Sequence, residues 1–119
     1  MKIYLFLFLT CLLFTNVSSQ TRKNDNQSAL VEAQLQRKID SLINLGNSYF
    51  MNSDNESLLK SIECYDEVLK LNPNCARAYF NKGNSNILLG FNYEACRNFK
   101  KAKELGHPTA NEYIHKFCN

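Results

Sequence analysis

From about residue 28 onward, the apolar residues recur every three or four positions, which is the spacing of one helix face. A first stripe is Leu35, Ile39, Leu42, Gly46 and Tyr49, and a second is Leu58, Ile62, Tyr65 and Leu69. No stretch alternates apolar and polar residues as a half-buried strand would. The pattern therefore predicts an all-α fold.

Turn-forming residues divide the pattern into five predicted helices. Ser53 and Glu56 have the spacing of a capping box, which marks a helix start. That helix ends before Pro73, because proline cannot continue it. Pro108 is expected in the first turn of the last helix, where its missing N–H would be unpaired anyway. The predicted helices cover about residues 28–52, 53–72, 75–89, 92–105 and 108–118.

The first 19 residues have a different composition. Lys2 gives a positive start, and residues 3–14 are apolar apart from Thr10. A run of about a dozen is too short to span a bilayer, which takes about 20 residues, but it suits a secretory signal. Small residues at 17–19 favour cleavage after Ser19. We therefore expect residues 1–19 to be a signal peptide and the chain to be exported, either periplasmic or secreted.

Two alternatives to a cleaved signal stay open. The chain could be a lipoprotein acylated on Cys11, but the stretch before Cys11 is short and Leu12 to Phe14 would follow the anchor where polar residues are usual. An uncleaved anchor is the other. Residues 20–27 hold no apolar residue and are predicted to be a disordered tether.

Charge narrows the class of partner. The 119 residues contain 14 Lys+Arg and 11 Asp+Glu, and removal of the signal would leave a net charge of only +2. Nucleic-acid-binding proteins are usually far more basic, so we expect this chain to bind no nucleic acid. We also expect no stable membrane span once the signal is cleaved. Residues 28–72 hold four basic and seven acidic side chains, whereas residues 77–119 hold seven and three. This division would allow weak head-to-tail association of copies.

The chain also repeats itself. Residues 46–48 (Gly-Asn-Ser) recur as residues 83–85, which is 37 positions later. Ser61, Tyr65, Val68 and Leu71 recur as Ala95, Phe99, Ala102 and Leu105, each 34 positions later. The difference of three falls in the turn at residues 51–55. A period near 34 built from helix–turn–helix units is the tetratricopeptide spacing.

On these residues, positions 39–118 resemble the tetratricopeptide repeat family. The second repeat carries Tyr79–Asn84, Gly90–Ala95, Phe99, Ala102 and Pro108, and a weaker first copy has Leu42, Leu45, Gly46, Tyr49, Tyr65 and Pro73. The end of the chain resembles small exported tetratricopeptide proteins of Bacteroidetes-type bacteria. The resemblance implies a short helical solenoid over residues 28–119, with two repeats and a C-terminal capping helix.

Other features follow from, or depart from, that resemblance. Gly46 and Gly83 would let paired helices approach closely, with Tyr65 and Phe99 filling the space. Lys82 and Asn86 depart from the family pattern, which has an apolar and an aromatic residue there. About three repeats are normally needed for a continuous core, so the first and last helices are expected to act as caps.

The resemblance also implies a function. First helices of such repeats line a concave groove for a peptide or partner segment. The implied groove positions are Ile43, Asn47, Phe50, Arg77, Phe80, Asn81, Asn84, Ile87 and Leu88. The asparagines could bond a peptide backbone. Some members hold a chaperone's C-terminal carboxylate with a lysine where this chain has Ile43, so that activity is not expected.

Four cysteines remain after the signal. If the last two helices reverse at residues 106–107, Cys96 and Cys118 lie nearly opposite each other, which predicts a disulfide in an exported domain. The alternative is that both merely pack as small apolar side chains. Cys64 and Cys75 are about two turns out of register and are predicted to be free.

No catalytic or metal site is expected. Cys96, His107, His115 and Cys118 offer zinc-type ligands, but His107 would lie at the opposite end of the hairpin from the other three. No nucleophile pair, phosphate-binding loop or cofactor motif is visible.

Two functional hypotheses therefore stand. In the first, the chain is an exported, non-enzymatic interaction module with an open groove around Asn47, Phe80 and Asn84. In the second, it is a structural or self-associating protein of the cell envelope, and residues 28–41 cover that groove.

Overall fold

The computed structural model describes the backbone of residues 2–118 and the side chains of residues 20–118. These residues form five α-helices and no strand, so the prediction of an all-α fold is confirmed. The helices are α1 (Lys2–Asn52), α2 (Asn55–Leu71), α3 (Ala76–Leu88), α4 (Asn92–Glu104) and α5 (Ala110–Phe117). The chain divides into two compact units, residues 1–36 and 37–119, and each is described by itself.

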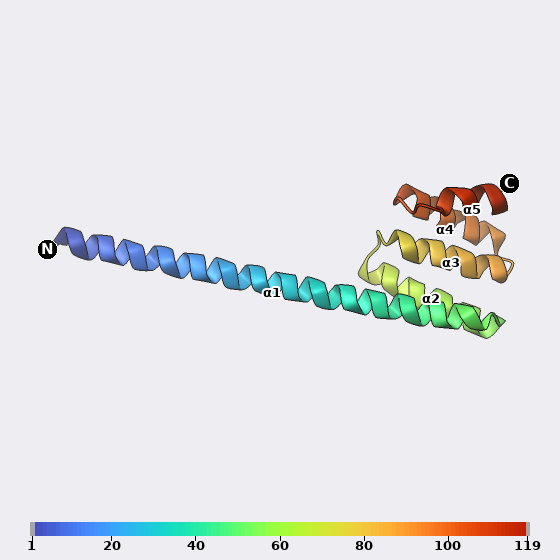
Figure 1. Cartoon of the computed structure of the whole chain (residues 1–119), viewed down its shortest axis with the longest axis horizontal. Helices are drawn as coiled ribbons and strands as arrows, with labels where there is room; N and C mark the ends of the chain where they lie inside the picture. The colour runs from blue at the N-terminus through green and yellow to red at the C-terminus, as the bar shows by residue number, and fades with distance from the viewer. Residues whose placement is uncertain (1, 119) are drawn as a thin grey trace. The chain divides into compact units, whose positions relative to one another are not determined.

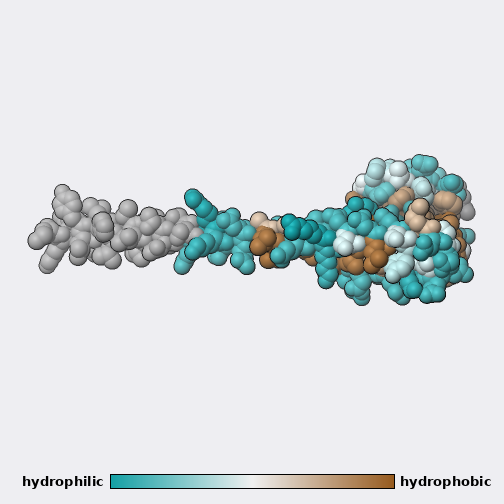
Figure 2. Space-filling model, turned by 60° about the horizontal axis from the view of Figure 1, so that its bottom comes forward, coloured by the Kyte–Doolittle hydropathy of each residue, from teal (hydrophilic) through white to brown (hydrophobic). Residues whose placement is uncertain are grey.

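The first unit is helical. Helix α1 runs through residues 20–27, where the sequence predicts a disordered tether, and it begins well before the predicted start at Ser28. A physical reason is that residues 20–36 contain no proline or glycine that would end a helix. Leu30, Val31 and Leu35 are exposed, and Figure 2 shows brown side chains on this otherwise polar segment.

The predicted signal peptide and its Ser19 cleavage site lie outside the residues whose side chains the structure describes. Among the described residues, no helix combines the length and the apolar character needed to cross a membrane.

The second unit is a row of antiparallel helices. Residues 37–52 of α1 pair with α2, and Figure 1 shows α2, α3, α4 and α5 following one another side by side. Each helix packs on the next in the chain. The observed bounds of α3 and α4 agree with the sequence predictions to within one residue.

The same close contact occurs in both helix pairs. A Cβ atom added to Gly46 of α1 would lie 2.7 Å from the Tyr65 ring of α2, and one added to Gly83 of α3 would lie 2.5 Å from the Phe99 ring of α4. Only glycine leaves room for an aromatic ring this close to a helix backbone. The predicted close approach at both glycines is therefore confirmed.

Two apolar clusters make up the core. The first contains Ile39, Ile43, Tyr65, Val68 and Ala78, and the second contains Phe80, Ala95, Phe99, Ala102 and Ala110. Between them, the hydroxyls of Ser61 and Ser85 form a buried 2.7 Å hydrogen bond that links α2 to α3. The last helix, which was expected to act as a cap, packs on the second cluster through Tyr113, Ile114 and Phe117.

The start of α2 differs from the predicted capping box. Asp54, not Ser53, is the N-cap, and its carboxylate accepts a 2.9 Å hydrogen bond from the Ser57 backbone N–H. Ser53 has a φ of 59°, in the left-handed region. Glu56 binds Lys60 one turn along instead of the helix start. An aspartate with extended backbone conformation supplies the same cap, so the prediction named the wrong residue.

The start of α5 also differs from its prediction. The helix begins at Ala110, so Pro108 lies in the preceding turn and not in the first helical turn. His107 in this turn stacks on Phe80, with ring centroids 4.0 Å apart. This turn brings the apolar face of α5 onto the second cluster.

A disulfide joins Cys96 of α4 to Cys118 at the end of α5, as predicted, with 5.6 Å between the Cα atoms. Cys64 and Cys75 are free thiols, which also agrees with the sequence prediction. Burial raises the pKa of the Cys64 thiol. Its thiolate is therefore disfavoured, and it is a packing residue of α2.

The glycine contact gives the first testable prediction. Gly83→Ala should lower the free energy of unfolding by about 1–2 kcal/mol. Overpacking against the Phe99 ring costs about 1–3 kcal/mol, and the higher helix propensity of alanine offsets up to about 1 kcal/mol of this loss. Ser48→Ala on an exposed turn of α1 is the control and should not destabilise the chain. Combining Gly83→Ala with Phe99→Leu should cost less than the sum of the two. Additive losses in urea unfolding would contradict the contact.

The disulfide gives a second prediction. Reduction should lower the free energy of unfolding by about 3 kcal/mol, because the bond closes a loop of about 22 residues in the unfolded chain. Urea unfolding with and without reductant measures this loss. The double variant Cys64→Ala/Cys75→Ala should keep the full sensitivity to reductant, whereas Cys96→Ala/Cys118→Ala should have none. A midpoint that reductant does not move would refute the bond.

Candidate functional site

Helix α3 lies at the centre of the second unit and packs against its neighbours on two of its sides. Consecutive residues turn by about 100° around an α-helix. Ala78 and Ser85 face α1 and α2, while Phe80 and Gly83 face α4 and α5. Two opposite faces remain accessible. One carries Arg77, Asn81, Asn84 and Leu88, and the other carries Tyr79, Lys82 and Asn86.

On the first of these faces, Asn47 of α1 is the centre of a polar network. Its amide oxygen accepts hydrogen bonds from the Tyr65 hydroxyl (2.8 Å) and from Asn81 Nδ2 (2.9 Å). Burial raises the pKa of Tyr65 to about 12, so its hydroxyl stays protonated and donates. These bonds leave the Asn47 nitrogen and the Asn81 oxygen for other partners.

One turn away, a salt bridge links the same two helices. Arg77 of α3 binds Asp40 of α1 with 2.7 Å between nitrogen and oxygen. Both side chains are about half exposed, so the pair contributes little to stability. We define the α1–α3 face as the surface formed by Asp40, Asn47, Arg77, Asn81 and Asn84. The salt bridge holds its two charges at one end of this face.

The remaining predicted groove residues divide into two groups. Ile43 is only 1% exposed and belongs to the first core cluster, so its side chain offers no surface to a partner in this structure. Phe80 is also buried, by Phe99, His107 and Tyr113. Phe50 and Ile87 are half-buried, and Leu88 is exposed.

Residues 28–41 were expected to cover the groove if the chain is structural. Within the second unit, Asp40 contacts Arg77 and Ile39 lies in the core, while Asn47 is exposed and Asn84 is half-buried. Phe80 is covered by His107 and by Tyr113 of α5. Residues 28–36 belong to the first unit, so the expectation that residues 28–41 cover the groove stays a prediction for that part of the segment.

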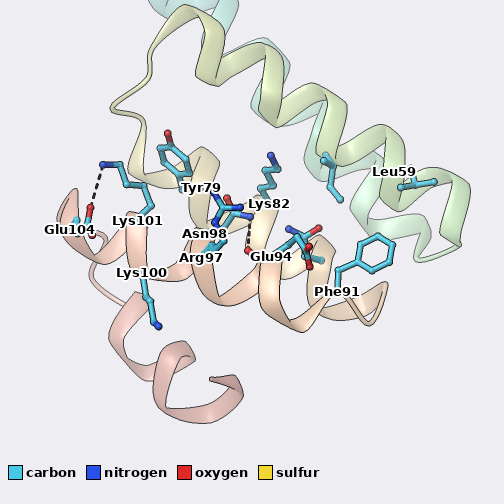
Figure 3. Close-up of a pocket in the computed structure, with 12 residues that line it drawn as sticks. Leu59, Tyr79, Lys82, Phe91, Glu94, Arg97, Asn98, Lys100, Lys101 and Glu104 are labelled. Carbon is cyan, nitrogen blue, oxygen red and sulfur yellow. Dashed lines mark hydrogen bonds and ion pairs between the residues drawn. The ribbon is translucent and has the colours of Figure 1, made fainter. Parts of the chain in front are cut away.

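A cleft lies on the opposite face of α3. It has a volume of about 770 Å³ and is bounded by α2, α3, the α3–α4 turn and α4 (Figure 3). Its walls combine apolar and charged side chains. They are Leu59, Ile62, Tyr79, Lys82, Asn86, Phe91, Glu94, Arg97, Asn98, Lys100, Lys101 and Glu104.

Lys82 and Asn86, the two departures from the family pattern, both line this cleft. Lys82 is about a quarter exposed and binds Asp66 of α2 with 2.6 Å between nitrogen and oxygen. Asn86 is 3% exposed, and its Nδ2 has no hydrogen-bond partner among the atoms the structure describes. Such an unpaired buried donor costs about 1–3 kcal/mol. Nothing in their spacing along the sequence indicated that these two residues share a site.

The four residues that offered zinc-type ligands do not gather around one point in the part of the chain that the structure describes. The sulfurs of Cys96 and Cys118 are bonded to each other, so they cannot serve as zinc ligands. Over the described residues, no three His, Cys, Asp or Glu side chains gather to hold an ion. His107 instead stacks on Phe80 and lies 3.2 Å from the Thr109 hydroxyl.

The chain was also compared with known proteins. No protein-family model matches it, and no curated protein matches it either. Its function must therefore be argued from the two accessible faces of α3.

A third prediction concerns His107. Burial lowers the pKa of this side chain below its ordinary value of 6.5, because the charged ring would lose solvation against Phe80. Stability from this site is full above about pH 6.5 and is lost as the pH falls toward the folded pKa, since the unfolded chain binds the proton first.

The measurement is urea unfolding between pH 7.5 and pH 5. His107→Phe should flatten the loss of stability in this range, whereas His115→Gln, at an exposed residue of α5, should not. Equal slopes for the parent chain and His107→Phe would show that this ring does not titrate with folding.

Proposed function

We propose that residues 37–119 form a tetratricopeptide-type interaction module, which is exported and binds an extended segment of a partner protein on the α1–α3 face. The repeated contacts of Gly46 with Tyr65 and of Gly83 with Phe99 support the family. The apolar N-terminal segment and the Cys96–Cys118 disulfide both suit export.

The observation that carries the binding proposal is the arrangement of Asn47 and Asn81. Asn81 Nδ2 donates to Asn47 Oδ1, so the Asn47 nitrogen and the Asn81 oxygen keep their capacity for further hydrogen bonds on an accessible face. A peptide group presents the complementary pair, a carbonyl acceptor and an N–H donor. An extended segment could therefore bond to this face through its backbone, with specificity added by Arg77 and Leu88.

The alternative is a structural or self-associating role in the cell envelope. The acidic side chains of α2 and the basic side chains of α4 favour it, because unlike charges on two ends of a short array attract between copies. In that case the groove would be occupied by a helix of the chain itself and would not bind a partner segment.

The fourth prediction tests the binding proposal. A library of random twelve-residue peptides is selected on the purified chain, whose intact mass shows whether residues 1–19 are gone. Peptides that use the α1–α3 face should lose affinity about tenfold on Asn81→Ala or Asn84→Ala, as for hot-spot residues. Asn98→Ala on α4 is the matched control and should have little effect on them. Selected peptides that ignore both α3 variants would refute this face as the site.

A further inference from the structure

The cleft between α2, α3 and α4 contains a polar group that the fold leaves unpaired. Asn86 lines the cleft, yet its Nδ2 has no hydrogen-bond partner among the described atoms. Buried polar groups are nearly always bonded, so this exception calls for a cause. A half-turn of the amide exchanges its oxygen and nitrogen without moving α3, so the donor is not confined to its unpaired position.

One cation in the cleft is also available. Lys82 binds Asp66, and Lys101 binds Glu104. Arg97 on the same wall makes no ion pair with any residue that the structure describes. Figure 3 shows Arg97 beside Asn98 on the α4 wall, while Lys100 points away from the other labelled side chains. Arginine presents a planar fork of donors that suits a carboxylate.

The other end of the cleft is apolar. Leu59 of α2 and Phe91 of the α3–α4 turn are 48% and 47% exposed, and both line the cleft. Ile62 and Tyr79 are half-buried beside them. Figure 3 shows Leu59 and Phe91 at the end away from Lys101 and Glu104. Exposed apolar side chains bordering a cleft are typical of an interaction site.

We propose that this cleft is a second binding site, which takes a short acidic and apolar segment of a partner protein. A bulky apolar side chain of the segment packs between Leu59 and Phe91. A carboxylate further along binds Arg97, and a backbone carbonyl accepts from Asn86. Phe91 and Lys101 are ten residues apart, which is about 15 Å along a helix, or the length of about five extended residues.

Charge favours an acidic protein segment over a nucleic acid. Four cationic and two acidic side chains line the cleft, so its net charge attracts a few carboxylates. Glu94 and Glu104 stand among the cations and would repel a run of phosphates. The site is independent of the α1–α3 face, because Tyr79, Lys82 and Asn86 lie on the opposite side of α3.

The experiment uses the same peptide library on the full chain, followed by fluorescence anisotropy of the enriched peptides. We expect a class that combines a large apolar residue with Asp or Glu. Arg97→Glu should weaken this class at least about tenfold, since it reverses the charge that is proposed to bind the carboxylate of the segment. Lys103→Glu makes the same change of charge on an exposed turn of α4 outside the cleft and should change affinity less than about twofold.

Asn86→Leu provides an independent arm. It removes the unpaired donor at similar volume, so the chain should unfold at no lower urea concentration, while the affinity of the same peptides should fall at least about fivefold. Asn84→Ala should leave these peptides unaffected, which separates this site from the α1–α3 face.

Four outcomes would overturn the proposal. The first is that no enriched peptide is sensitive to Arg97→Glu. The second is that Arg97→Glu and Lys103→Glu weaken binding equally, which would be general charge attraction. The third is a dimer in sedimentation that Arg97→Glu dissociates, which would make a second copy the occupant. The fourth is a single-stranded oligonucleotide that competes with the peptides.

Discussion

The second unit depends on how closely an aromatic ring approaches a glycine in each helix pair. Gly46 receives the ring of Tyr65, and Gly83 receives the ring of Phe99. These contacts set the distance between the paired helices and therefore the positions of α3 and its neighbours. Every other feature of the two accessible faces is placed relative to those helices.

The two contacts are equivalent in shape but not in chemistry. Tyr65 has a hydroxyl, which donates a hydrogen bond to the side-chain amide oxygen of Asn47, the residue that follows Gly46. Phe99 has none, so Asn84, the residue after Gly83, gains no such bond from it. The repeat therefore fixes one asparagine through its aromatic partner and leaves the orientation of the other to its surroundings. The Tyr65 hydroxyl therefore gives the first repeat a side-chain hydrogen bond on the α1–α3 face that Phe99 cannot give the second repeat.

The features that follow from helical periodicity could be predicted from the sequence. The features that depend on contacts between different helices could not. Helical spacing predicted the bounds of α3 and α4, and antiparallel register predicted the Cys96–Cys118 bond, since both are local geometry. The burial of Ile43 and Phe80 depends on which residues of α2, α4 and α5 reach them. The cap at Asp54 depends on a left-handed Ser53, and the cleft around Asn86 needs three helices in place. None of these is encoded in spacing alone.

The disulfide also decides where the array can open. In a row of helices that contact mainly their neighbours, separation starts at an end. At the C-terminal end, α5 cannot leave α4 while Cys96 and Cys118 are joined. The pair formed by residues 37–52 and α2 has no such link, and its α2 carries the buried free thiol of Cys64. Opening of this chain is therefore directional, and the buried Cys64 thiol lies at the end that opens first, where its reaction with a thiol reagent reports that opening.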